Sequence, residues 1–266
     1  MKSCYPALYV SLILSVFMLF GFVPADKPLR TVKNQSFRTG ETLKYKIHYG
    51  FITAAEGIID IDHNLHRVNN RPCYRVNVLG KTVGSFDYFL RIRDTFRSYI
   101  DTTAIVPQRF QQSKEEGRYR KKETIDFDHI LNTATVNNNN SHKVPENIQD
   151  IVSGMFYLRT LNLDSYRQGD LIKVKGFFDE EVYELTVIYM GKEIADTKVG
   201  KIRAHRLVPK LPNNKLFRGE NAISLYLSDD KNKVPVLGKA EMFVGSVHLD
   251  LYEYTGLRHK LNTVQK

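Results

Sequence analysis

Alternation of apolar and polar side chains is the feature that most constrains how this chain can fold. Leu43, Tyr45, Ile47 and Tyr49 are separated by single polar residues, Lys, Lys and His. Because successive side chains of a β-strand point to opposite faces of a sheet, this period of two predicts a strand with one buried and one solvated face.

The same alternation recurs along most of the chain, in short runs separated by glycine, asparagine and proline. We predict strands at 43–49, 58–61, 74–78, 86–93, 95–101, 108–113, 119–127, 133–136, 171–175, 183–189, 197–208, 222–227, 234–244 and 247–254, with a turn at 190–192. The connections between them are short, and consecutive short strands of this kind favour an antiparallel meander.

One segment changes from the strand period to a helical period. Pro145 and Glu146 are typical of a helix start, and we predict a helix at about 145–162. Its apolar stripe consists of Ile148, Ile151, Val152, Met155 and Leu158. Such a stripe must be buried, and the concave side of a curved sheet is the natural place for it. The predicted fold is therefore mainly β, a curved antiparallel sheet or open barrel wrapped around one central amphipathic helix.

The N-terminus has the pattern of a secretory signal peptide. Lys2 precedes an apolar stretch, which ends at Val23-Pro24-Ala25. We predict a signal peptide at 1–25, an extended arm at 26–38, a single β domain at 39–258 and a tail at 259–266. The protein would then be periplasmic or otherwise exported, with no transmembrane span after cleavage. The alternative is an uncleaved anchor, because the uncharged run is long enough to cross a bilayer.

Signal removal would leave Cys73 as the only cysteine, so no internal disulfide is predicted. Cys73 lies in an alternating, strand-like run, which favours a small buried hydrophobe over a reactive thiol.

The formal net charge of +10 makes the chain strongly basic. An exported protein is not expected to meet nucleic acid, so this charge favours anionic lipid head groups or acidic polysaccharide as partners, or serves solubility alone. The densest basic run, residues 118–122, is flanked by three glutamates, a mixed pattern that is typical of a solvated hairpin.

Three local strings, in the same order along the chain, resemble a bacterial envelope family, domain of unknown function 3108. They are residues 37–45 (FRTGETLKY), 149–159 (QDIVSGMFYLR) and 227–236 (LSDDKNKVPV). The resemblance implies a secreted, mostly antiparallel β protein, similar in fold to the open barrels that carry lipoproteins and lipids across bacterial envelopes. It implies no activity, ligand or catalytic residue.

Ser228-Asp229-Asp230 is the most conspicuous polar string. It could supply paired carboxylates for a cation or for acid–base chemistry, but a β-turn capped by its own side chains accounts for all of it. The eight histidines show no metal-binding spacing, and the sequence contains no nucleophile elbow or phosphate-binding glycine loop. We therefore predict no metal, no cofactor and no enzymatic activity.

The predicted function is non-enzymatic binding of an apolar or amphiphilic envelope molecule such as a lipid. The predicted ligand-lining residues lie on the helix: Ile151, Met155, Phe156, Leu158 and Arg159. In this interpretation the helix is a partial plug beside a cavity; alternatively it simply completes the core. Arg159 is placed to cap carbonyls at the helix end, with an acidic head group as its alternative partner. Two other functions stay open, a module docking glycans or envelope proteins, and a hydrolase of envelope polymers.

Overall fold

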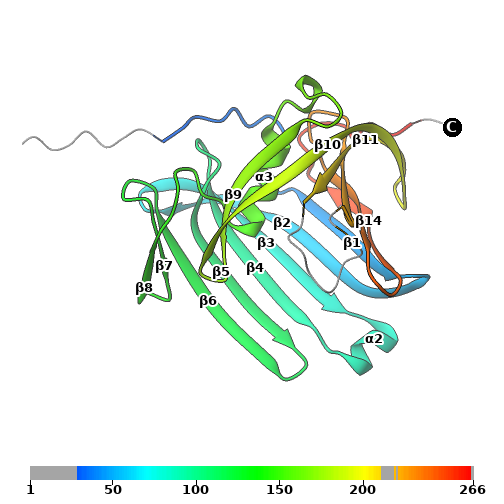
Figure 1. Ribbon diagram of the computed structural model, residues 1–266, viewed down its shortest axis with the longest axis horizontal. Coiled ribbons are helices and arrows are strands. Elements are labelled where there is room, and N and C mark those ends of the chain that lie inside the picture. Colours follow the sequence, from blue (N-terminus) through cyan, green and yellow to red (C-terminus); the bar gives the residue numbers. More distant parts are fainter. Residues whose placement is uncertain (1–28, 211–218, 220, 265–266) are drawn as a thin grey trace, which may run out of the picture.

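The computed structural model describes residues 29–210, 219 and 221–264, which form one 14-stranded antiparallel sheet (Figure 1). The strands are β1 (Thr42–Tyr49), β2 (Ile52–Val68), β3 (Arg71–Thr82), β4 (Arg93–Asp101), β5 (Pro107–Glu116), β6 (Tyr119–Asp128), β7 (Thr133–Val136), β8 (Asn140–Lys143), β9 (Leu171–Phe178), β10 (Glu181–Thr197), β11 (Gly200–Pro209), β12 (Ile223–Ser228), β13 (Pro235–Glu241) and β14 (Ser246–Thr255). The helices of the described residues are short: α2 (Gly84–Phe89), α3 (Ile151–Thr160) and a 3₁₀ turn at Leu163–Ser165. The prediction of a mainly β, antiparallel fold is confirmed.

Strand order follows the chain in two meanders that meet in the middle of the sheet. The order is β8-β7-β6-β5-β4-β3-β2-β1-β14-β13-β12-β11-β10-β9, so the first and last strands of the chain pair with each other. Every other pair of neighbouring strands is consecutive in the chain, and the segment between β8 and β9, which carries α3, links the two edges of the sheet. The sheet is therefore open, and it bends so that β9 and β10 pass across the concave side (Figure 1).

The two edges approach each other without a continuous ladder. Lys121 on β6 contacts Asp179 at the β9–β10 turn (2.8 Å), and His142 on β8 contacts Glu180 (3.0 Å). On the other side of β9, the backbone N–H of Gln149 donates to the carbonyl of Lys175 (2.9 Å), in a single parallel bridge. Strand β10 is joined to β11 by a full antiparallel ladder, whereas the free edge of β9 is attached to the rest of the sheet only by side chains and this short bridge.

Helix α3 lies between β4 and β9, inside the curve of the sheet. It begins at Asp150, whose carboxylate accepts from the backbone N–H groups of Val152 (2.8 Å) and Ser153 (2.7 Å). The Ser153 hydroxyl accepts in return from the Asp150 N–H (2.9 Å), which completes a capping box. The predicted helix start at 145 is wrong, because the backbone of Gln149 is already used in the bridge to β9. The apolar stripe also differs, since Ile151 is exposed.

Two further local predictions are wrong. Residues 86–93 were expected to form a strand, but α2 occupies the first half of this segment and β4 begins only at Arg93. Tyr88 and Phe89 are exposed there, so their apolar character does not report a buried strand face. The turn expected at 190–192 is a bulge within β10, where the pairing with β11 shifts register between Tyr189 and Lys192.

The arm and the tail are irregular but packed. Phe37 is buried in the main core cluster with Phe156 of α3, and the N–H of Val32 donates to the carbonyl of Thr103 (2.8 Å). At the other terminus Leu261 is buried, and the N–H of Val264 donates to Lys201 (2.8 Å). The predicted signal peptide at 1–25 lies outside the described residues. Within the described ranges, no helix has the length and apolar character needed to cross a membrane.

Candidate functional site

A buried ion pair fixes the C-terminal end of α3. The Arg159 guanidinium donates to both carboxylate oxygens of Glu41, at 2.6 and 2.9 Å, and both side chains are only 1% exposed. Its Nε donates to the carbonyl of Asn232 at the β12–β13 turn (3.1 Å). Bidentate geometry and a further acceptor provide the compensation that a buried guanidinium needs.

Aromatic rings complete the surroundings of this pair. The Arg159 guanidinium lies 5.3 Å from the ring centre of Phe37 and 5.1 Å from that of Phe156. The Ser36 hydroxyl donates to the Arg159 carbonyl (2.6 Å), so the arm also supplies a partner for the end of the helix. Arg159 thus joins α3 to the arm, the start of β1 and the β12–β13 turn, and positions the helix inside the sheet.

An apolar pocket of about 360 Å³ lies on the concave side of β1 to β4, and we call it the β1–β4 pocket. Residues from the sheet and one side chain of α3 line it, including Tyr45, Ile59, Val78, Phe96, Leu249 and Met155. Burial holds the pKa of the Tyr45 phenol above its usual range, and its hydroxyl donates to the carbonyl of Pro235 (2.9 Å). Its polar atom is therefore satisfied within the protein, and the pocket is left almost wholly apolar.

Two glycines hollow out this pocket. Gly57 on β2 and Gly80 on β3 are register partners, and Gly57 also pairs with Tyr45. A Cβ on Gly80 would meet no atom within 4 Å, so the sheet presents open space at this position. Glycine in the interior of a strand often marks a place where something else approaches the backbone.

A second apolar pocket, of about 470 Å³, lies between α3 and the β9–β10 hairpin, and we call it the β9 pocket. Its lining from the helix is Ile151, Gly154, Met155 and Leu158, and its lining from the hairpin includes Val174, Phe178, Tyr183 and Leu185. Met155 lines both pockets. A flexible, polarizable thioether therefore stands between two apolar spaces.

The structure brings only part of the predicted lining together. Met155 faces both pockets, and Ile151 and Leu158 line the β9 pocket. Phe156 is buried instead against Phe37, with ring centres 4.7 Å apart, and Arg159 is held by Glu41. Neither of these two side chains is among the residues that line either apolar pocket. That a ligand occupies the pockets stays a prediction.

A polar cluster lies at the edge of a different cavity, and the sequence pattern indicates only one of its members, Asp229 of the Ser-Asp-Asp string. Donor atoms of Asp164, His205 and Asp229 lie within 4.8 Å of one another, an arrangement that could hold a metal ion. The Lys192 ammonium contacts Asp164 at 2.7 Å and Asp229 at 3.0 Å. A protein cation therefore already balances these two carboxylates.

His205 is the buried member of this cluster. Its Nε2 lies 3.1 Å from an Asp229 carboxylate oxygen, and its Nδ1 lies 3.0 Å from the Tyr189 hydroxyl. Burial lowers the pKa of His205, and the charge of Asp229 opposes this shift. These residues come from three separate strands and turns, so no local spacing could have revealed them.

The neighbouring Asp230 has the structural role that the turn interpretation predicts. Its carboxylate accepts from the backbone N–H groups of Asn232 (2.8 Å), Lys233 (3.3 Å) and Asn262 (3.0 Å). The two carboxylates of the Ser-Asp-Asp string thus have different surroundings, one capping a turn and the other facing His205 and Lys192.

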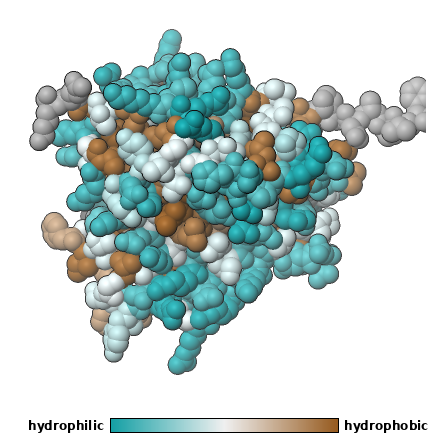
Figure 2. Space-filling view, turned by 180° about the vertical axis from the view of Figure 1, so that it is seen from behind, coloured by the Kyte–Doolittle hydropathy of each residue, from teal (hydrophilic) through white to brown (hydrophobic). Residues whose placement is uncertain are grey.

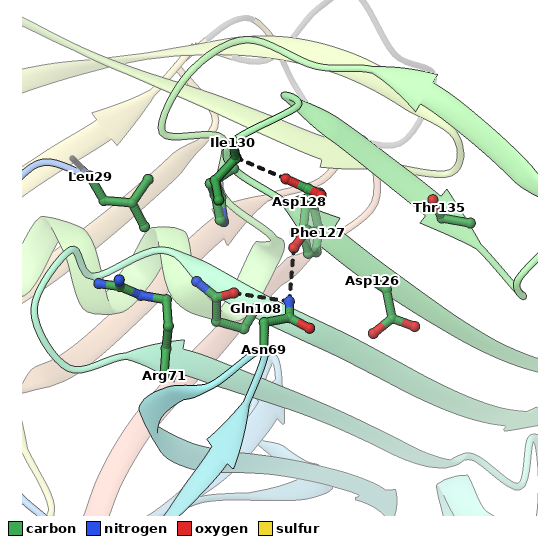
Figure 3. A pocket seen from close by; sticks show the side chains of 10 residues that line it. Leu29, Asn69, Arg71, Gln108, Asp126, Phe127, Asp128, Ile130 and Thr135 are labelled. Atoms are coloured by element: carbon green, nitrogen blue, oxygen red, sulfur yellow. Dashed lines mark hydrogen bonds between the residues drawn. The ribbon is translucent and has the colours of Figure 1, made fainter. Parts of the chain in front are cut away.

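The largest of the cavities described, about 520 Å³, is polar and lies by the β2–β3 turn (Figure 3). The Asn69 amide donates to the Gln108 side chain (3.0 Å) and to the carbonyl of Phe127 (3.2 Å). Asp128 accepts from the N–H of Ile130 (2.9 Å). Most of these polar groups hold turns together, which gives the cavity a structural explanation.

Comparison with known proteins supports the fold more than any activity. Residues 44–252 match the family described as protein of unknown function (DUF3108). No curated protein matches the chain. A β-barrel-like protein of domain of unknown function DUF1849 from Brucella abortus is similar in structure, with a TM-score of 0.52 and 9% identity, over 86% of this chain and 99% of that one. A DUF1089 family protein from Pseudomonas aeruginosa has a TM-score of 0.40 and 8% identity, over 80% of this chain and 95% of that one.

Proposed function

The chain belongs to the DUF3108 family of proteins of unknown function, and we propose that it binds the apolar part of a lipid or similar amphiphile without catalysing a reaction. The observation that carries the proposal is the pair of apolar pockets on either side of Met155. Each has a volume within the range of about 300–1,000 Å³ that is typical of small-molecule sites.

The lining of the pockets supports an apolar occupant. Aliphatic and aromatic side chains dominate both pockets, and glycines at Gly57 and Gly80 replace side chains that would otherwise fill the β1–β4 pocket. Apolar surface of this kind is favourably removed from water by a hydrocarbon chain, at about 25 cal/mol per Å² buried. A ligand with a long apolar chain gains most from two such spaces that share one lining residue.

Export to the bacterial envelope is part of the same proposal. It is supported by the signal-peptide pattern of residues 1–25, which predicts delivery to a compartment rich in amphiphiles. The paired carboxylates required for the hydrolase alternative have other partners here, since Asp230 caps a turn and Asp229 faces Lys192. This arrangement supports binding over hydrolysis.

The test fills the pocket from the sheet side. Gly80→Leu adds bulk into open space, and it should lower the affinity for a fluorescent fatty acid such as cis-parinaric acid at least tenfold. Leu65→Phe, which adds bulk to an exposed side chain of the neighbouring strand β2, is the matched control and should leave the affinity unchanged. Far-UV circular dichroism checks that both variants fold.

Native mass spectrometry of the purified wild-type protein provides a second readout, in which a bound lipid should appear as a discrete mass increment. If the wild-type protein neither retains lipid nor binds the probe, or if Gly80→Leu binds the probe as well as the wild type, the proposal is wrong.

A further inference from the structure

Exposed apolar side chains gather at one end of the barrel. Phe51 is 105% exposed, Tyr88 88% and Phe89 82%, values close to those of an isolated residue. The full set, which we call the aromatic end, is Phe51, Ile52, Tyr88, Phe89, Leu90, Phe243 and Val244. Single exposed hydrophobic residues are ordinary, whereas a cluster of seven that includes three phenylalanines marks an interaction site.

These residues come from three segments that are fastened together. The N–H of Gly50, in the β1–β2 turn, donates to the carbonyl of Ser246 (3.1 Å), and the Tyr49 hydroxyl donates to the carbonyl of Val244 (2.8 Å). The ring of Tyr49 also lies 6.1 Å from that of Phe86 in α2. The β1–β2 turn, the β13–β14 turn and α2 therefore form one surface. In Figure 2, seen from behind, brown side chains project from the left-hand edge, the end that carries α2 in Figure 1.

Basic residues flank the aromatic end. The N–H of Gly117, at the tip of the β5–β6 hairpin, donates to the carbonyl of Arg91 (2.8 Å), and Leu90 approaches the same glycine. This contact places the exposed Arg118 and Arg120 beside α2. The basic run that looked like an ordinary solvated hairpin in the sequence thus borders the exposed aromatic residues.

We propose that the aromatic end docks on the surface of an anionic lipid bilayer. Its apolar side chains project separately from turns and a short helix. A fluid bilayer can accommodate each of them without a surface of complementary shape. Aromatic residues are favoured at the membrane–water interface, and arginines beside them are attracted to anionic head groups. The chain's net charge of +10 has the matching sign.

Docking at this end also places the β1–β4 pocket close to the bilayer. Thr82 and Ile92, which flank α2, line that pocket. The inferred role of docking is the exchange of an apolar chain between the bilayer and the pocket, and this role rests on the proposed function. Docking itself is a separate property that can be measured without any cargo.

Because the sequence contains no tryptophan, the fluorescence of a single introduced tryptophan reports only on the site where it is placed. Phe89→Trp places a single indole at the aromatic end, and Leu131→Trp places one at an exposed site on the β6–β7 turn. Vesicles of phosphatidylcholine with 30% phosphatidylglycerol should shift the emission of the first variant to shorter wavelength and leave the second unchanged. Equal shifts, or no shift in either variant, would overturn the proposal.

Vesicle sedimentation then tests the contribution of the side chains. The triple variant Phe51→Ser, Phe89→Ser, Phe243→Ser should partition at least tenfold more weakly onto the anionic vesicles. A control triple at exposed apolar sites elsewhere, Leu65→Ser, Leu131→Ser, Ile194→Ser, should behave like the wild type. Arg118→Gln with Arg120→Gln should weaken binding to anionic vesicles and reduce its dependence on salt.

Two outcomes distinguish this inference from the proposed function. If Gly80→Leu loses the fatty-acid probe but still binds vesicles, both proposals hold. If the wild-type protein binds the probe but not vesicles, or forms a dimer that the serine triple dissolves, docking on a bilayer is refuted while the pocket proposal stands.

Discussion

Separating the two members of the buried Arg159–Glu41 pair should destabilise the protein more than removing both. Glu41→Leu leaves a guanidinium with no carboxylate in surroundings that are 1% exposed, and arginine cannot discharge by losing a proton. Breaking a buried pair from one side costs about 3–5 kcal/mol. Arg159→Met leaves the buried Glu41 carboxylate without its partner, so we expect a loss in the same range.

The double variant Glu41→Leu, Arg159→Met places two aliphatic side chains near Phe37 and Phe156. Replacing a buried ion pair by hydrophobic residues of similar volume is often neutral or stabilising. We therefore expect the free energy of unfolding of the double variant to lie above that of the Glu41→Leu variant. The coupling between the two positions should amount to several kcal/mol.

Equilibrium urea denaturation, followed by tyrosine fluorescence and circular dichroism, measures these differences. With an m-value of roughly 2–3 kcal/mol/M, a loss of about 4 kcal/mol lowers the urea midpoint by roughly 1.5 M. Lys44→Ala, which removes the exposed pair with Glu253, is the control and should leave the urea midpoint close to that of the wild type. The reasoning fails if each single variant costs less than about 1 kcal/mol, or if the double variant loses the sum of the two single losses.

Three further predictions concern other buried positions. Burial raises the pKa of Asp150 to about 6, so its stabilising contribution is fully present below about pH 4 and is lost as the pH rises through 6. The stability of Asp150→Asn relative to wild type should therefore rise by about 2 kcal/mol between pH 4 and pH 7, and equal urea midpoint differences at both pH values would contradict this. Burial raises the pKa of Cys73 to about 12, so iodoacetamide at pH 8 should label it only in urea, and rapid labelling of the native protein would show the thiol is accessible. Gly256→Ala would bring a Cβ within 1.9 Å of the Gly40 carbonyl oxygen, at a φ of +68°. It should therefore lower the thermal midpoint clearly more than Gly50→Ala, where the φ is +57° but no atom lies within 4 Å of the added Cβ. Equal thermal midpoints for the two variants would refute the clash.

The sequence predicts the strands well because most of them have one buried face. Leu43 and Tyr45 are buried while their neighbour Lys44 pairs with Glu253 at the surface, and this is the situation that period-two alternation reports. The strand expected at 86–93 is wrong, because Tyr88 and Phe89 of this segment are exposed and do not form a buried strand face. A pattern of residue types cannot distinguish apolar side chains that are buried from apolar side chains that project from the surface.

Long-range pairing limits what could be predicted of the site. The positions of Met155 and Leu158 beside the pockets follow from helical spacing, which is local information. The Glu41–Arg159 pair joins residues 118 positions apart, and the hollow at Gly57 and Gly80 depends on strand register. The start of α3 is set by the bridge between Gln149 and β9 in the same way. Each of these features exists only once distant segments have met.

The gap between strands β8 and β9 has a mechanical consequence. A barrel whose ladder runs all the way around can expand only by breaking main-chain hydrogen bonds along a whole strand. Here the free edge of the β9–β10 hairpin is held by the Gln149 bridge, by ion pairs such as Lys121–Asp179, and by buried packing of Ile172 and Val174 against Leu158. Outward movement of this hairpin would therefore have to disrupt side-chain packing and one bridge, but none of the thirteen hydrogen-bonded strand pairs of the described residues.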